Sequence, residues 1–372
     1  MTTRRTPLRR SDPSRRGVLA WSLAGLPLAL GLSWSAGAPG DAVASARAGL
    51  HTGDGGGDDP VEDALRRRDR PLLTETVGLL MQVAVQAGDR VIFDQQVSRV
   101  RHHLLAPCGL LAWRATPDLG AVASSSAAID DLAVVRALLM AADRWACDEA
   151  RQLALSIAAA VARHEVVDGW LVDAASWEGD EVVPSSRIQT AYLALDVMAR
   201  LAPLAPVWAA VLERSVGLLG ELESPLGLFP EEAALPGSGA EEPGPTSVVN
   251  AILVLYCALH LALVGRGGER TLDFLRARWR ADARLAGRYR FSDGRPIEGF
   301  ESVAVHGLAA RLARALGDAP LADQLLTRLL AYQLYDPVTA SPAGPLPHRD
   351  TTPFDNLQAL LALQQASFWR SR

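Results

Sequence analysis

The stretch AILVLYCALHLALV, Ala251–Val264, is apolar at almost every position. LAVVRALLMAA, Leu132–Ala142, has the same character apart from one arginine. A helix that is apolar all round is buried on all sides. Other segments, such as ERTLDFLRARWRADAR (Glu269–Arg284), are amphipathic, which suits a helix between a core and solvent. The chain therefore contains helices of an inner kind and of an outer kind.

The two kinds of helix alternate with a nearly constant period. Helices that follow long loops rich in Gly, Pro, Ser, Asp and Glu begin near residues 75, 130, 187, 247, 301 and 354, in steps of 55, 57, 60, 54 and 53. Each step holds two helices, and residues 61–70 supply one more, so about twelve helices form six pairs. Strand signals are almost absent. An open solenoid and a closed double ring both fit, and the helices that are apolar all round favour the ring. We expect an all-α fold, an (α/α)6 barrel or six-hairpin toroid.

The first 48 residues have the layout of an export signal. A basic region precedes an apolar stretch from about residue 17 to 32, and small residues follow, up to Ala46-Arg47-Ala48. The pair Arg15-Arg16 is typical of a twin-arginine signal. The alternative is an uncleaved anchor, for which an apolar stretch of about 16 residues with Pro27 inside it is marginal. We expect a signal peptide over 1–48, a flexible linker over 49–60 and the (α/α)6 domain over 61–372 of an exported protein without stable membrane insertion.

Composition excludes several kinds of chemistry. All 37 positive residues are arginine, so sites that need a lysine, such as P-loops, Schiff bases and protein-kinase centres, are not expected. The net charge is −5, and without residues 1–48 it is −10, which argues against a nucleic-acid partner. The three cysteines are too scattered for a zinc site or a disulfide framework, and the histidines show no metal spacing. We expect neither a metal nor a cofactor.

The long loops and the N-termini of the inner helices should lie on one face. Acids and other polar residues stand at those helix starts, among them Glu75, Asp130, Asp131, Arg187 and Asp355. Carboxylates that face one another across a depression can cleave a glycosidic bond, with one protonating the leaving oxygen and another activating water. The plainer interpretation is that acids in a first turn cap the helix or complement its dipole. Loop aromatics that could stack on sugars, or form hydrophobic lids, are Trp113, Trp170, Trp177, Tyr289 and Phe291.

Three segments resemble glycoside hydrolase family 8. LTETVGLLMQVAVQAGDRVIFD (Leu73–Asp94) is similar to the family's first motif, a Ser-Glu-Gly opening to an inner helix. SSSAAIDDLAVVRALLMAADRW (Ser124–Trp145) resembles the second, an Ala-Ser-Asp-Ala-Asp opening to a helix that ends near a Trp. GWLVDAASWEGDEVVPSSRIQTAYLAL (Gly169–Leu195) and the Tyr335-Asp336-Pro337 turn look like a divergent branch found beside exopolysaccharide-synthesis genes. The resemblance covers roughly residues 61–370, in the motifs' correct order.

The resemblance implies roles for particular residues. Glu75 matches the family's general acid, and Asp131 or, with a shift of one residue, Asp130 matches its central sugar-binding acid. The family's general base is an Asp at the start of the fourth inner helix, where this chain has Asn250, and an amide is no useful base. Other acids then become candidates for the base: Asp355, Glu301, Glu298, Asp336, Glu231, Glu232, Glu241 and Glu242. The residues expected to bind substrate are Trp113, Arg187, Tyr192, Trp177, Asn250, Glu301 and Asp355.

The resemblance also implies an inverting endo-glycanase that acts on a β-linked polysaccharide of glucan, chitosan, xylan or exopolysaccharide type. We expect the protein to act as a monomer, with the polysaccharide as its partner. Asn250 motivates an alternative, a glycan-binding or polysaccharide-assembly protein that has lost hydrolysis. A third hypothesis is a uronate-handling lyase or hydrolase of the same fold, which the acid-rich loops disfavour because a substrate carboxylate needs a basic cleft.

Overall fold

The computed structural model describes residues 71–239, 243–244, 246–297, 301–333 and 353–370. The expected signal peptide, linker and first outer helix lie outside these ranges. So do four of the acids considered as a base, namely Glu241, Glu242, Glu298 and Asp336, together with the turn that contains the last of them.

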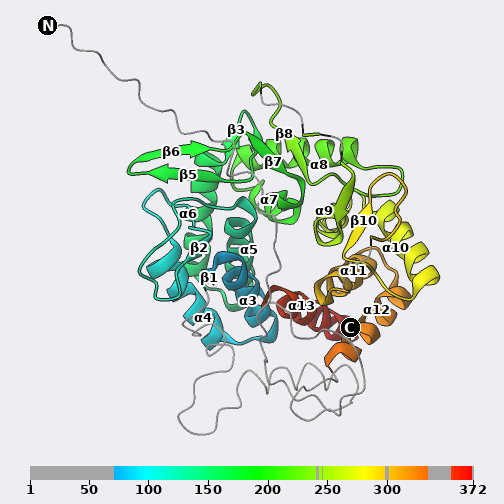
Figure 1. The fold of residues 1–372 in the computed structure, drawn as a ribbon. Helices are drawn as coiled ribbons and strands as arrows, with labels where there is room; N and C mark the ends of the chain where they lie inside the picture. Colours follow the sequence, from blue (N-terminus) through cyan, green and yellow to red (C-terminus); the bar gives the residue numbers. More distant parts are fainter. Residues whose placement is uncertain (1–70, 240–242, 245, 298–300, 334–352, 371–372) are drawn as a thin grey trace, which may run out of the picture.

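Six inner helices form a closed ring (Figure 1). Each contacts the next inner helix along the chain, and the last contacts the first. The (α/α)6 barrel expected from the repeat is therefore confirmed. The inner helices are α3 (Thr74–Ala87), α5 (Ala128–Trp145), α7 (Leu195–Leu201), α9 (Ala251–Leu263), α11 (Val303–Ala315) and α13 (Pro353–Arg370).

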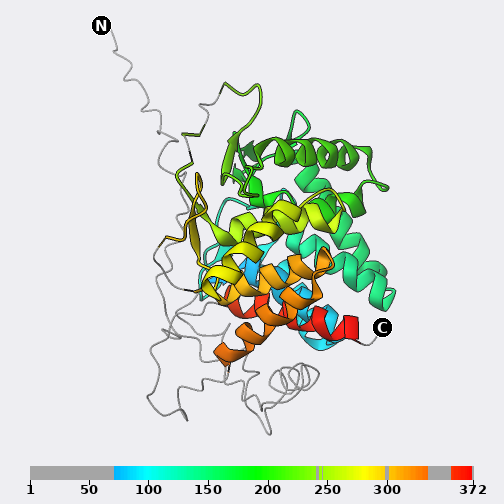
Figure 2. The ribbon, with the colours of Figure 1, turned by 90° about the vertical axis from the view of Figure 1, so that its right-hand side faces the viewer.

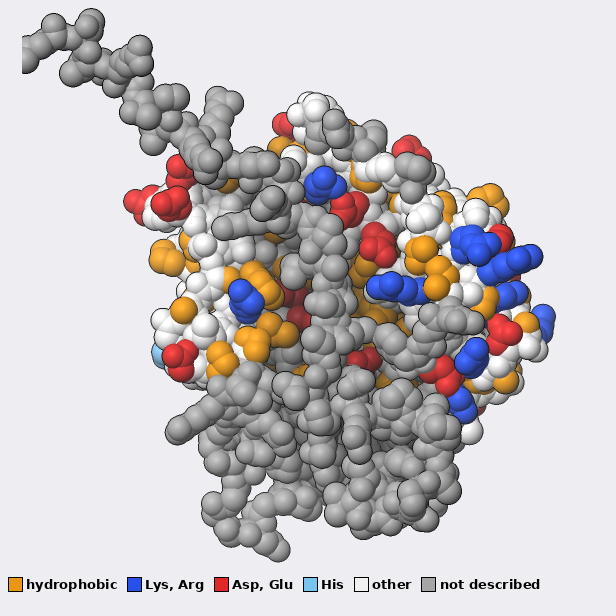
Figure 3. Space-filling model, viewed as in Figure 1, with side chains coloured by type: hydrophobic (Ala, Val, Ile, Leu, Met, Phe, Trp, Pro, Cys, Tyr) orange, Lys and Arg blue, Asp and Glu red, His pale blue; other side chains and the backbone are white. Residues whose placement is uncertain are grey.

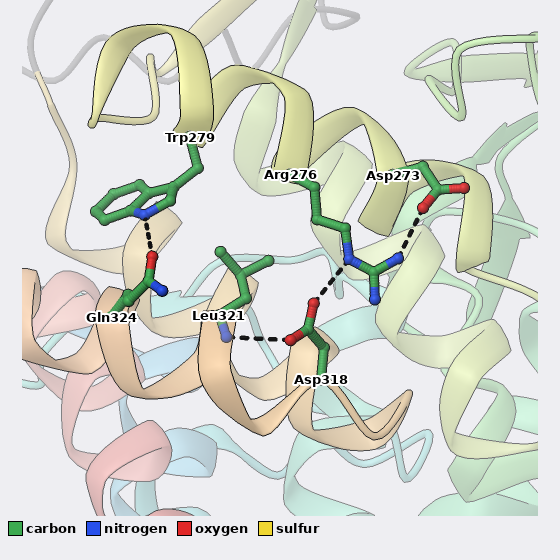
Figure 4. A network of polar contacts seen from close by, with 6 residues as sticks. All are labelled: Asp273, Arg276, Trp279, Asp318, Leu321 and Gln324. Carbon is green, nitrogen blue, oxygen red and sulfur yellow. Dashed lines mark hydrogen bonds and ion pairs between the residues drawn. The ribbon is translucent and has the colours of Figure 1, made fainter.

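The outer helices each pack on the inner helix that precedes them. They are α4 (Arg90–Arg99), which continues into a π-helical turn over Val100–Leu104, α6 (Asp148–His164), α8 (Pro206–Leu222), α10 (Glu269–Asp282) and α12 (Ala319–Gln333). Neighbouring outer helices are also joined by polar contacts (Figure 4). Trp279 Nε1 on α10 donates to Gln324 Oε1 on α12 at 2.7 Å, and Arg276 pairs with Asp318 at the start of α12 at 2.7 Å.

Two glycines let inner helices approach closely. A Cβ on Gly78 of α3 would lie 3.1 Å from the Cβ of Ala133 on α5. A Cβ on Gly307 of α11 would lie 2.9 Å from the carbonyl oxygen of Gln358 on α13. Alanine and leucine fill most of the remaining core, which keeps the ring narrow and brings the starts of its helices together.

Short antiparallel strand pairs decorate the long loops. Within the described ranges the pairs are β1 (Leu72–Leu73) with β2 (Arg114–Ala115), β3 (Val166–Val167) with β4 (Trp170–Leu171), β5 (Ala175–Glu178) with β6 (Glu181–Pro184), β7 (Arg187–Gln189) with β8 (Glu232–Ala234), and β9 (Val248–Asn250) with β10 (Arg288–Arg290). Strands of two to four residues are too short to show alternation in a sequence, so they were not predicted.

The strand β7 corrects the helix expected to start at residue 187. Its three residues pair with β8, Ile188 is buried against the core, and a 3₁₀ turn over Thr190–Tyr192 follows. The third inner helix begins only at Leu195. Pairing satisfies the backbone groups of residues 187–189, so the helix starts later than the polar pattern indicated.

The described parts of the long loops and the N-termini of the inner helices share one face, as expected. Seen from the side in Figure 2, the gold strand β10 lies at one end of the ring, and the helices extend away from it. Figure 3 shows acidic side chains beside hydrophobic ones towards the middle of that face. Among the described residues, no helix is both long and apolar enough to span a membrane.

Candidate active site

Glu75 lies in the first turn of α3, and the loop after α4 fixes that turn. Thr74 donates from its backbone N–H to the Trp113 carbonyl at 3.0 Å and from its hydroxyl to the Ala112 carbonyl at 2.6 Å. Burial raises the pKa of Glu75 well above its usual value, and the nearby carboxylates of Asp130 and Asp355 raise it further. Glu75 therefore holds a proton at pH values where an exposed glutamate is ionised.

The neighbouring acids Asp130 and Asp131, in the first turn of α5, face different surroundings. Asp131 is fully buried and accepts a hydrogen bond from the Leu111 N–H at 2.8 Å, which ties α5 to the loop after α4. Burial, and then the charge of Glu165, raises its pKa. Burial raises the pKa of Asp130 to about 8, and Asp130 acts electrostatically on Glu75. Of the two, Asp130 belongs to the cluster around Glu75.

Two tyrosines also belong to this cluster. The predicted Tyr192 is the last residue of the 3₁₀ turn before α7, and burial, Asp130 and Glu75 raise its pKa. Tyr256, on α9, was not singled out from the sequence. Burial and then Glu75 raise its pKa, and its hydroxyl oxygen accepts from Gln358 Nε2 at 2.6 Å. A phenol inside an otherwise apolar helix was the sequence signal that could have identified it.

Asp355 joins the cluster from α13. Its Oδ1 accepts from the Ser302 hydroxyl at 2.9 Å and from the Ala304 N–H at 3.4 Å, so it links the starts of α13 and α11. The carboxyl is buried and close enough to Glu75 to raise the pKa of that residue. Asp355 thus stands beside Glu75, on the adjacent inner helix.

Deeper in the ring lies a polar pair that the sequence analysis missed. Arg136 on α5 donates to both carboxylate oxygens of Asp196 on α7, at 2.7 and 2.6 Å. Burial alone would raise the pKa of Asp196, but the charge and hydrogen bonds of Arg136 hold it well below its usual value. Arg311 on α11 donates to Gln358 Oε1 at 2.9 Å, and burial lowers the pKa of Arg311 to about 10. These groups form a charged, hydrogen-bonded layer inside the ring.

Two predicted tryptophans lie in the loops between inner helices. The backbone N–H of Trp113 donates to the Ser125 carbonyl at 3.0 Å, and the backbone N–H of Trp177, on β5, donates to the Ser124 carbonyl at 2.9 Å. Both residues are half-buried; the Arg114 guanidinium stacks 4.5 Å from the centre of the Trp113 ring, and Trp177 packs partly against the core. Of the two, Trp113 lies next to the start of α3, because its carbonyl accepts from the Thr74 N–H.

Other loop aromatics are engaged elsewhere. Arg214, from the outer helix α8, lies over the Trp170 ring at 5.4 Å. Tyr289 is buried with its ring edge-on to Phe274, and its hydroxyl accepts from the Ala286 N–H at 2.8 Å. Phe291 is partly buried against the core. These three are packing residues rather than exposed platforms for a sugar.

Two charged residues predicted to bind substrate lie in ion pairs. Arg187 is on β7 and donates to Glu232 Oε2 at 2.6 Å. Glu301 accepts from Arg328 of the outer helix α12 at 2.7 Å and lies 3.7 Å from the Nε2 of His306. Arg187 is exposed at the rim, whereas Glu301 faces the space between α11 and α12 and not the acid cluster.

Asn250 caps a helix. Its Oδ1 accepts from the Ile252 N–H at 2.9 Å, and its backbone N–H donates to Glu231 Oε1 at 3.0 Å. A carboxylate from the preceding loop is therefore held at the start of the fourth inner helix. Among the described residues, no group of three or more His, Cys, Asp and Glu side chains is placed to hold a metal ion.

The chain is similar to known proteins over most of its length. The sequence model of a family described as "Glycosyl hydrolases family 8" matches residues 62–263. YdaJ of Bacillus subtilis (strain 168), a lipoprotein by name, is 24% identical over 296 residues, 79% of each protein. A solved structure described as a novel alpha-amylase from Clostridium perfringens has a TM-score of 0.71 and 24% identity, over 79% of this chain and 87% of that chain. An endo-1,4-D-glucanase from Vibrio fischeri ES114 has a TM-score of 0.63 and 17% identity, over 81% and 89%. These two structures share the fold.

Proposed function

The chain belongs to glycosyl hydrolases family 8, and on that premise we propose that it is an exported endo-glycanase that cleaves a β-linked polysaccharide with inversion. Family membership indicates a glycoside hydrolase that acts on β-glucans or xylans. The layout of residues 1–48 and the name of the Bacillus subtilis relative, a lipoprotein, support export.

The place of Glu75, in the first turn of an inner helix and close to the carboxyls of Asp130 and Asp355, is the observation that carries this proposal. Glycosidic oxygens are poor leaving groups until they are protonated, and the protonating acid must keep its proton near neutral pH. Burial and two neighbouring carboxylates provide this for Glu75. Glu75 lies in the first turn of the inner helix α3, next to the loop that contains Trp113. Glu75 would donate its proton to the glycosidic oxygen as the bond to the anomeric carbon breaks.

The remaining residues of the cluster would hold the sugar at the cleavage point. Asp130 and Tyr192 lie beside Glu75 and can bond ring hydroxyls. Trp113 lies beside the start of α3 and Trp177 lies on β5; both residues are partly exposed, and a further sugar could stack on either. A chain bound across several such positions would be cut internally.

One observation favours a second candidate, a glycan-binding protein without hydrolysis. The residue in the place of the family's general base is Asn250, whose side chain caps its own helix. Under this alternative, the cluster around Glu75 would hold a polysaccharide and leave it intact.

An activity screen with one variant separates the two candidates. The protein is incubated with β-glucans, chitosan, xylan and starch, the last because of the alpha-amylase neighbour, and the anomer of the first product is read by NMR. We expect product of inverted configuration from at least one polymer. Glu75→Gln should lower the rate by about 10²–10⁴-fold and leave polysaccharide binding unchanged. Glu221→Gln, an exposed change on α8, is the matched control. Binding without product from the wild type on every polymer would favour the second candidate.

A further inference from the structure

We propose that Glu231, in the loop before α9, is the general base of this enzyme. The inference rests on the proposed glycoside hydrolysis and supplies the carboxylate that Asn250 does not. Glu231 precedes β8, and the 3₁₀ turn before α7 holds its carbonyl, which accepts from the Thr190 N–H at 3.0 Å and from the Thr190 hydroxyl at 3.1 Å. These bonds hold the backbone of Glu231, and the Asn250 N–H holds its side chain.

Glu231 stands on the opposite side of the ring from the acid. The N–H of Asn250 anchors its Oε1 at the start of α9. Figure 1 shows α9 across the ring from α3, which carries Glu75. Thr190 and Asn250 anchor Glu231, and they are followed along the chain by Tyr192 and Tyr256. Glu75 raises the pKa of both tyrosines. An inverting enzyme needs its acid and base on opposite faces of the scissile bond, and residues at the starts of helices on opposite sides of the ring can supply them.

The free oxygen of Glu231 can reach water. The residue is half-buried, and its Oε1 is occupied by the Asn250 N–H. Its Oε2 makes no hydrogen bond within the described chain and is not among the buried polar atoms without a partner, so it is open to solvent. One anchored and one accessible oxygen is what a base needs to orient and deprotonate a water molecule.

Three other described acids that were considered as a base are less suitable. Asp355 lies on α13, beside α3, and therefore on the side of the acid. The next residue after Glu231, Glu232, points away along β8 into its ion pair with Arg187. Glu301 pairs with Arg328 of an outer helix. Of these four acids, Glu231 is the one held at the start of α9, where it can contact a water molecule.

The chemical step balances with two carboxyl groups and one water molecule. The water oxygen forms a bond to the anomeric carbon while its proton passes to Glu231 Oε2. The bond from that carbon to the glycosidic oxygen breaks, and this oxygen takes the proton of Glu75. Glu231 ends protonated and Glu75 ionised, and exchange of one proton through solvent restores the starting state.

The test compares Glu231→Gln and Glu231→Ala with wild type on the polymer that wild type cleaves best. Glutamine keeps an oxygen for the Asn250 N–H but cannot take a proton, so kcat should fall by about 10²–10⁴-fold while KM changes by less than about threefold. Glu231→Ala with added azide should regain at least about tenfold in rate and yield a glycosyl azide of inverted configuration, because azide attacks without a base. Glu221→Gln, on an outer helix, should retain wild-type kcat.

The outcomes separate this assignment from the function on which it rests. An active wild type together with a Glu231→Gln rate within threefold of it would overturn the assignment alone. A low rate in both variants with no azide rescue, and a large rise in KM, would also overturn it, because those changes report a structural role. A wild type that releases no product from any polymer would overturn the proposed function as well.

Discussion

Replacing Glu165 by glutamine should make the protein more stable at high pH. Glu165 follows α6 and is fully buried. Its Oε1 accepts from the Ser126 hydroxyl at 2.5 Å, and its Oε2 has no hydrogen-bond partner. Asp131, also fully buried, has an unpartnered Oδ2, and the two carboxyls repel each other when both are charged. Glutamine keeps the oxygen that Ser126 needs and removes the possibility of a buried charge.

The magnitude follows from the pKa of Glu165, which burial raises from 4.5 to about 8. A carboxyl with a higher pKa in the folded protein binds more protons there than in the unfolded chain, so the free energy of unfolding falls as the pH rises between these two values. At about 1.4 kcal/mol per pKa unit, the loss attributable to Glu165 is about 5 kcal/mol by pH 8. This is comparable with the whole stability of many domains, about 5–15 kcal/mol.

Urea unfolding at pH 5 and at pH 9 measures this difference. We expect Glu165→Gln and wild type to have similar free energies of unfolding at pH 5, and the variant to be more stable by several kcal/mol at pH 9. The exposed change Glu221→Gln should follow wild type at both values. A difference between Glu165→Gln and wild type that is the same at pH 5 and at pH 9 would refute the reasoning, because a pH-independent effect cannot come from the ionisation of Glu165.

Two further predictions test the site and the ring. Asp130→Asn removes a charge that raises the pKa of Glu75, so the alkaline fall of kcat/KM should move to lower pH; an unchanged or higher midpoint would contradict the coupling. Gly307→Ala should destabilise the protein by about 1–3 kcal/mol in urea unfolding, because its Cβ would lie 2.9 Å from the Gln358 carbonyl oxygen. Gly220→Ala on α8, where a Cβ meets nothing within 4 Å, should instead stabilise it by about 1 kcal/mol.

The ring was predictable because two signals in the sequence agree. The period of the long loops gives six helix pairs, and segments such as Ala251–Val264 show which member of a pair is buried on all sides. The places of Glu75 and Asp130 in the fold were predictable for a related reason, since an acid in the first turn of an inner helix must lie on the loop face. The choice between Asp130 and Asp131 was not, because adjacent residues differ by about 100° around a helix and the sequence does not give its rotation.

The polar layer inside the ring was missed for a physical reason. A single charged residue in an apolar helix can face the ring's axis, a neighbouring helix or solvent, and its partner can lie far away in the chain. Arg136 and Asp196 are 60 residues apart, and Gln358 and Tyr256 are 102 apart. Such pairs become visible only when the ring closes. The general signal, a charge within a helix that must be buried, was present in the segment that contains Arg136.

The N-termini of the inner helices favour ionised carboxylates, but burial outweighs that effect. A helix N-terminus stabilises a negative side chain by about 0.3–1 kcal/mol, and by about 2 kcal/mol at most. The pKa of Asp130 rises from 3.8 to about 8, which corresponds to a net cost of about 6 kcal/mol for ionisation. The α3 and α5 side of the ring therefore keeps protons on its carboxyls and is suited to donate one. A general base must take a proton from a water molecule. In the proposed mechanism Glu231, with one oxygen held at α9 and the other open to solvent, meets that water on the opposite side. In the proposed mechanism, burial on one side and solvent access on the other divide proton donation and proton acceptance between Glu75 and Glu231.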